Sequence, residues 1–135
     1  MAALDRPAPK ARPVYLNLFA IRLPLPGFVS ILHRISGALL FLIGIPLALY
    51  IVQQSLASAE GWAHMRAALS HPLAKLVLVL LAWAYFHHFI AGVRHLWMDA
   101  THSVTKEQGH SSAIVTLAAS AVLTIVLGAK LFGLF

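Results

Sequence analysis

Three long uncharged apolar runs constrain this 135-residue chain more than any other feature of its sequence. No charged residue lies between Arg34 and Glu60 or in residues 111–129, and only a pair of histidines interrupts residues 76–93. Each run reaches the roughly 18–20 residues that cross about 30 Å of hydrocarbon as a helix. We therefore predict an all-α membrane protein with three transmembrane helices, at residues 29–54, 72–99 and 111–134.

The composition supports this fold class. Hydrophobic residues make up 60% of the chain and charged residues only 10%, whereas an ordinary soluble domain has about a quarter charged residues. The chain therefore lacks the polar surface of a soluble enzyme or a nucleic-acid-binding protein. It has no cysteine, which excludes disulfides, thiolate zinc sites and iron–sulfur ligation by this chain.

The first 28 residues differ from the rest, because basic residues alternate there with prolines that break helices and favour extended chain. We predict an extended basic cytoplasmic arm at 1–28 and a membrane-anchor domain at 29–135. A signal peptide has a short apolar core directly after its basic region, whereas here the apolar core comes later and is long. We therefore expect no cleaved signal peptide. Loops are expected at 60–71 and 100–110, and Pro46 should bend the first helix.

The distribution of Lys and Arg predicts the orientation, because cytoplasmic loops carry an excess of both. The N-terminal side, together with the loop at 100–110, holds seven of them: Arg6, Lys10, Arg12, Arg22, Arg34, Arg94 and Lys106. The other side holds three: Arg66, Lys75 and Lys130. We therefore expect an up-down-up arrangement with the N-terminus in the cytoplasm.

Three helices enclose little interior, so most of their surface must face lipid or protein. Small residues that allow close helix contact are frequent: Gly37, Gly44, Gly92, Ala113, Ala118, Ala119, Ala121 and Gly128. Each fits ordinary membrane packing, but together they favour a subunit of a heteromeric bundle.

The second apolar run contains a polar stripe. His88, Gly92, His95 and Asp99 are spaced four, three and four residues apart and share one helix face. A histidine this deep in a membrane is a functional candidate, and a neutral imidazole is a common axial ligand of haem iron. The alternative is a histidine that only hydrogen-bonds a neighbouring helix. His87 points about 100° away and fits packing better.

A second polar pair lies at the start of the first run. Ser30 and Arg34 are one helical turn apart, and together they could hydrogen-bond a quinone carbonyl or pair with a carboxylate. The alternative is an arginine that only extends to the membrane edge. The sequence contains no carboxylate pair, nucleophile triad or phosphate loop, so we expect no catalytic residue and no complete enzyme in this chain alone.

Two signatures give the chain a resemblance to a known family. The first consists of residues 12–18, Arg-Pro-Val-Tyr-Leu-Asn-Leu, and residues 30–37, Ser-Ile-Leu-His-Arg-Ile-Ser-Gly. The second is residues 88–99, His-Phe-Ile-Ala-Gly-Val-Arg-His-Leu-Trp-Met-Asp. These runs resemble the cytochrome b membrane-anchor subunits of succinate dehydrogenase, respiratory complex II. The resemblance covers nearly the whole chain.

The resemblance implies roles for single residues. His88 becomes an axial ligand of the iron of haem b, with His87 as the alternative that needs a test. The second axial ligand comes from a small anchor subunit, so the haem is shared. Ser30 and Arg34 become part of the ubiquinone site. His33, Arg34 and His95 are expected around the haem, Asp99 near the quinone pocket, and Arg94 near the haem edge or that pocket.

The resemblance also implies partners and a place. A flavoprotein subunit oxidises succinate and an iron–sulfur subunit passes electrons on. This chain with its small partner docks both and supplies the quinone pocket at the cytoplasmic surface. The arm at 1–28 would lie along the iron–sulfur subunit. We expect the bacterial inner membrane rather than the mitochondrial one, and no nucleic acid. The alternatives are an anchor of a quinol:fumarate reductase, a small transporter subunit and a non-redox membrane scaffold.

Overall fold

The computed structural model describes residues 21–102 and 105–135, and within these ranges every regular element is helical. In chain order these are α1 (Leu25–Leu39), a π-helical turn η1 (Leu40–Gly44), α2 (Ile45–Ala57), α3 (Ala59–Ser70), α4 (Pro72–Thr101) and α5 (Lys106–Leu131). Three continuous helices are long and apolar enough to span a membrane: Leu25–Ala57, Pro72–Thr101 and Lys106–Leu131. The predicted all-α fold with three helices of membrane-spanning length is confirmed, and the orientation in the membrane stays a prediction.

The first span begins at Leu25, four residues earlier than predicted. Pro24 is its N-cap and Pro26 lies in its first turn, where proline is tolerated because the first N–H groups of a helix have no intrahelical acceptor. The prolines therefore start this helix instead of preventing it. The predicted arm at 1–28 lies mostly outside the described residues, and its role stays a prediction.

The bend expected at Pro46 takes the form of the π-helical turn η1. The Ile45 N–H donates to the carbonyl of Leu40, five residues back. Proline cannot donate to the carbonyl four residues before it and clashes with that group. The wider turn directly before Pro46 accommodates this clash, so α1, η1 and α2 remain one continuous span.

The expectation of a loop at residues 60–71 was wrong, because this segment is the helix α3. Ser58 caps it by accepting a hydrogen bond from the Gly61 N–H at 3.0 Å, and Glu60 lies in the first turn, where a negative charge favours a helix. The loop expected at 100–110 is also shorter, because Thr105 and Gln108 form a capping box that starts α5 at Lys106.

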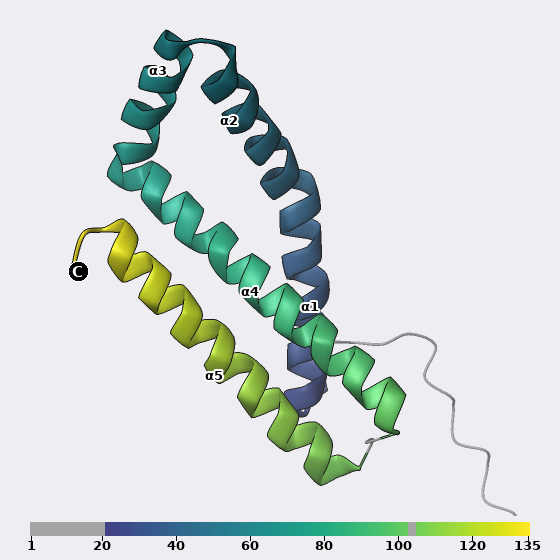
Figure 1. The fold of residues 1–135 in the computed structure, drawn as a ribbon. Coiled ribbons are helices and arrows are strands. Elements are labelled where there is room, and N and C mark those ends of the chain that lie inside the picture. Colours follow the sequence, from purple (N-terminus) through teal and green to yellow (C-terminus); the bar gives the residue numbers. More distant parts are fainter. Residues whose placement is uncertain (1–20, 103–104) are drawn as a thin grey trace, which may run out of the picture.

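Figure 1 shows how the spans are arranged: α4 and α5 run side by side in opposite directions, and α1 crosses them near its own start. The helix α2 diverges from α4, and α3 connects the far end of α2 to the start of α4. The small core lies at this crossing, where Val29, Ala91 and Ala113 are fully buried. Two of these are alanines, so the helix backbones approach closely. This crossing brings the polar residues of α1 against those of α4.

Candidate functional site

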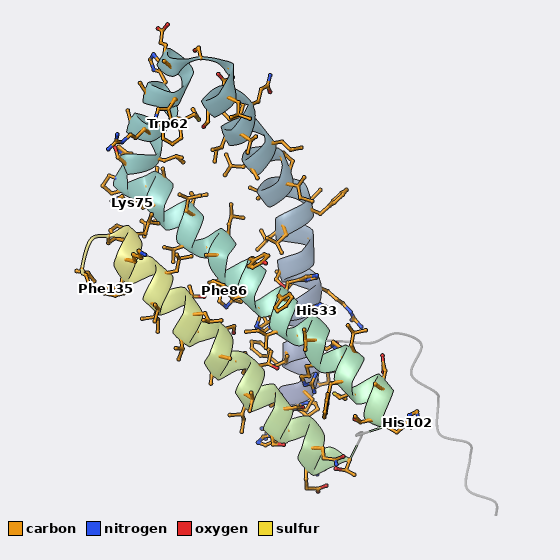
Figure 2. The ribbon with its side chains drawn as sticks, viewed as in Figure 1. His33, Trp62, Lys75, Phe86, His102 and Phe135 are labelled. Atoms are coloured by element: carbon orange, nitrogen blue, oxygen red, sulfur yellow. The ribbon has the colours of Figure 1, made fainter. Side chains whose placement is uncertain are left out.

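Two histidines meet at the crossing of α1 and α4. The rings of His33 and His88 stack, with centroids 4.3 Å apart and planes inclined by 20°. His88 Nδ1 lies 3.0 Å from the backbone carbonyl oxygen of His33. Because a carbonyl oxygen can only accept, Nδ1 carries the proton and Nε2 keeps its lone pair. Figure 2 labels His33, which lies where α1 and α4 cross.

Gly37 allows the His88 ring to come this close to α1. A Cβ atom at Gly37 would lie 2.7 Å from Cε1 and 3.0 Å from Nδ1 of His88. At Gly92, the glycine that the sequence placed on the histidine stripe, a Cβ would meet only His33 Nε2, at 3.6 Å. The tight position is therefore on α1 and not on α4. The importance of Gly37 was missed, although its place one turn after His33 was a usable signal.

A third histidine extends the cluster. The ring of His95 lies 5.4 Å from that of His33, inclined by 40°. His33 Nε2 is buried and has no hydrogen-bond partner among the described residues, and such atoms usually find a partner. Neither 21–102 nor 105–135 contains a group of three or more His, Asp or Glu side chains placed to hold a metal ion. A metal bound at His88 would need ligands from a macrocycle or another chain.

His87 faces a different neighbour. Its side chain is completely buried, lies beside the ring of Trp83 at 5.5 Å and has Nδ1 3.5 Å from Ser120 Oγ on α5. The Ser120 hydroxyl donates to the carbonyl of Leu117, so His87 Nδ1 is the donor to Ser120. His87 therefore packs α4 against α5 and also lies close to the backbone of Val29 on α1. Its Nε2 is buried without a hydrogen-bond partner among the described residues.

The other predicted site residues are not joined to the cluster by contacts. Ser30 is half-buried and Arg34 is exposed, one turn apart on α1, and neither side chain hydrogen-bonds another part of the described chain. Asp99 is exposed near the end of α4 and forms no ion pair with a described residue. The geometry leaves the polar groups of Ser30 and Arg34 available to a ligand.

Arg94 is a buried charge between α4 and α5. Only 7% of it is exposed, and it donates from Nε to Ser112 Oγ at 2.9 Å and from Nη2 to the carbonyl of Gly109 at 3.2 Å. It thus points to α5, away from the His33–His88 pair. The resemblance implied a place for Arg94 near the haem edge or the quinone pocket, which stays a prediction, and its partners on α5 were not predicted.

Comparisons with known proteins agree with one another. Residues 8–127 match the family described as succinate dehydrogenase/fumarate reductase transmembrane subunit. A succinate dehydrogenase cytochrome b556 subunit of Coxiella burnetii is 36% identical over 118 residues, which cover 87% of this chain and 94% of that protein. The subunit of the same name from Paracoccus denitrificans is 33% identical over 115 residues, covering 85% and 88%. That of Rickettsia felis is 27% identical over 116 residues, covering 86% and 90%.

Proposed function

The chain belongs to the family of succinate dehydrogenase/fumarate reductase transmembrane subunits, and on this premise we propose that it anchors a succinate:ubiquinone oxidoreductase in the membrane, binds haem b and forms part of the ubiquinone site. Its relatives are named cytochrome b556 subunits of succinate dehydrogenase. Three apolar spans fit an anchor. The chain alone is not an enzyme in this proposal.

The observation that carries the haem proposal is the state of the His88 ring. Its Nδ1–H donates a hydrogen bond to the His33 carbonyl oxygen, so Nε2 of the neutral ring has a lone pair, and it makes no hydrogen bond within the described chain. Histidines that bind metals commonly donate their other ring N–H to a carbonyl or carboxylate, which fixes the tautomer and strengthens the ligand. The residues present therefore fit an axial ligand of haem b.

When bound, the haem would accept and release single electrons at a potential set by its ligands and surroundings. The roles of this chain are to hold and orient His88, to keep its proton on Nδ1 and to surround the site with His33 and His95. The buried, unpartnered Nε2 of half-buried His33 could bond a carboxylate at the haem edge. His87 stays the alternative ligand; we favour His88 because the His87 ring is fully buried and its Nδ1 lies toward Ser120 on α5.

The quinone proposal rests on Ser30 and Arg34. A hydroxyl and a guanidinium one turn apart can both donate to a quinone carbonyl, and the charged donor favours the negative charge that develops on that oxygen during reduction. Neither group is committed to another described residue. Asp99 is proposed as a neighbour of this pocket.

The proposed partners are a flavoprotein subunit, an iron–sulfur subunit and a small anchor subunit that supplies the second haem ligand. The proposed location is the bacterial inner membrane with the N-terminus in the cytoplasm. The many large apolar side chains exposed on the spans, such as Phe41, Leu80 and Ile125, support burial in lipid or against a partner. An anchor of a quinol:fumarate reductase is the second candidate, since the matched family includes both enzymes.

The test is purification of the complex through a tag on this chain in mild detergent. We expect flavin, iron–sulfur clusters and b-type haem to co-purify, with succinate-dependent reduction of ubiquinone. A complex that carries menaquinone and is made during growth on fumarate would favour the second candidate. Purification without flavin or haem would contradict the anchor proposal.

A further inference from the structure

We propose that Gly37 is a positioning residue for the haem ligand: because it has no side chain, the His88 ring can reach the His33 carbonyl and is held in one orientation. This inference rests on the proposed role of His88 as an axial ligand. In this proposal, α1 determines the plane of the His88 ring, its tautomer and the direction in which its Nε2 points. Gly37 itself touches neither iron nor quinone in this proposal.

The steric argument starts from the direction of side chains on a helix. Cα–Cβ bonds tilt toward the helix N-terminus, so a side chain covers the turn before its own residue. The turn before residue 37 includes His33, and the His33 carbonyl is the group that His88 Nδ1 reaches at 3.0 Å. A side chain at 37 would therefore lie over the turn whose carbonyl holds the His88 ring, close to that ring.

The distances show how little room there is. A Cβ at residue 37 would lie 2.7 Å from His88 Cε1, closer than real Cβ contacts come, and 3.0 Å from Nδ1. The ring of His33 already covers one face of the imidazole, so the imidazole has no room to move in that direction. An added methyl group must therefore push the imidazole away from the carbonyl or turn its plane.

Three contacts from one short stretch of α1 thus restrain His88. The His33 carbonyl holds the Nδ1 edge, the His33 ring covers one face, and the backbone at Gly37 lies against the Cε1 corner. Since the two residues are one turn apart, α1 acts as a rigid template for the ring. A ligand fixed in this way loses little rotamer freedom when it binds, and its Nδ1–H bond raises its basicity.

The experiment compares the purified complex of the wild type with Gly37→Ala and with Gly128→Ala as the matched control. A Cβ at Gly128 would make only ordinary contacts with Val79, at 3.5 Å and 3.7 Å. The measurements are the low-spin ferric haem signal in electron paramagnetic resonance, which depends on the planes of the axial imidazoles, and the rate at which haem passes to excess apomyoglobin. Flavin content checks that the complex is assembled.

We expect Gly37→Ala to keep its flavin, shift the ferric haem signal and release haem faster by about tenfold or more, the usual effect of disturbing the partner of a metal ligand. Gly128→Ala should match the wild type. A Gly37→Ala complex with wild-type signal and release rate overturns the positioning role, even if His88→Ala removes the haem. Haem that persists unchanged in His88→Ala instead overturns the ligand role on which this inference rests.

Gly37→Ala could also prevent assembly. In that case the double variant Gly37→Ala/His88→Ala is compared with His88→Ala for the amount of this chain that accumulates in membranes. If the added methyl group clashes with the imidazole, removal of the ring restores accumulation to the level of His88→Ala. A double variant that accumulates less than His88→Ala shows that the methyl group disturbs something else, and this overturns the inference.

Discussion

Arg94 on α4 donates a 2.9 Å hydrogen bond from Nε to the hydroxyl of Ser112 on α5. The same guanidinium reaches the carbonyl of Gly109, so one buried side chain joins the two antiparallel spans next to the short connection between them. A buried charge is tolerated only when its donors are satisfied. The arrangement of α4, and with it the direction of His88, therefore depends partly on α5.

The first prediction concerns this contact. Ser112→Ala leaves the Arg94 Nε–H without its acceptor in a site that water hardly reaches, and should destabilise the complex by about 1–2 kcal/mol. The measurement is the midpoint of thermal unfolding in detergent. Ser111→Ala is the matched control, because the exposed Ser111 hydroxyl bonds only the carbonyl of Gln108 on its own helix. Equal midpoints for the two variants would refute the contribution of this bond.

The second prediction separates the two adjacent histidines. His87→Ala should retain the haem spectrum but lower the thermal midpoint, because it removes a completely buried ring between α4 and α5. Ser120→Ala should have a much smaller effect, since its bond to His87 is long, at 3.5 Å. Loss of haem in an assembled His87→Ala complex would show that His88 has been assigned as the ligand wrongly.

The third prediction tests the quinone site. Arg34→Leu should lower the reduction of ubiquinone by about tenfold or more, because a hydrogen bond to a charged donor contributes roughly 1.5–3 kcal/mol. Succinate oxidation with a soluble dye as acceptor should stay at the wild-type level. Arg66→Leu, an exposed arginine on α3, is the control and should leave both activities unchanged. If Arg34→Leu retains its quinone activity, Arg34 is not part of the site.

The fourth prediction concerns orientation and uses the absence of cysteine from the chain. Single cysteines replace two exposed residues, Ala63 on α3 and Glu107 on α5. With the N-terminus in the cytoplasm, a membrane-impermeant thiol reagent should label Ala63→Cys in intact cells and Glu107→Cys only after permeabilisation. The reverse pattern would contradict the positive-inside argument.

The number and type of the spans could be predicted from the sequence, because uncharged runs of this length have few other structures in a membrane. Smaller elements could not. The helix α3 replaced a predicted loop because one serine cap, Ser58, decided the conformation of a polar segment. The early start of α1 depended on Pro26 falling in a first turn, where it is tolerated.

The candidate site was predicted in part, since helical spacing alone separates the faces of His87 and His88. The contact between His88 and His33 spans 55 positions and depends on where α1 crosses α4, which no local pattern encodes. Gly37 shows the same limit. The sequence marked it as one small residue among several, and only the crossing shows that a side chain there would meet His88.

The most direct test of the central claim is a visible spectrum of the dithionite-reduced minus the oxidised complex, recorded for the wild type and His88→Ala. The control is His64→Ala, whose side chain is 77% exposed on α3. We expect a b-type haem signal in the wild type and in His64→Ala, and its loss or a clear shift in His88→Ala at equal flavin content. An unchanged signal in His88→Ala would contradict the claim that this residue binds the haem iron.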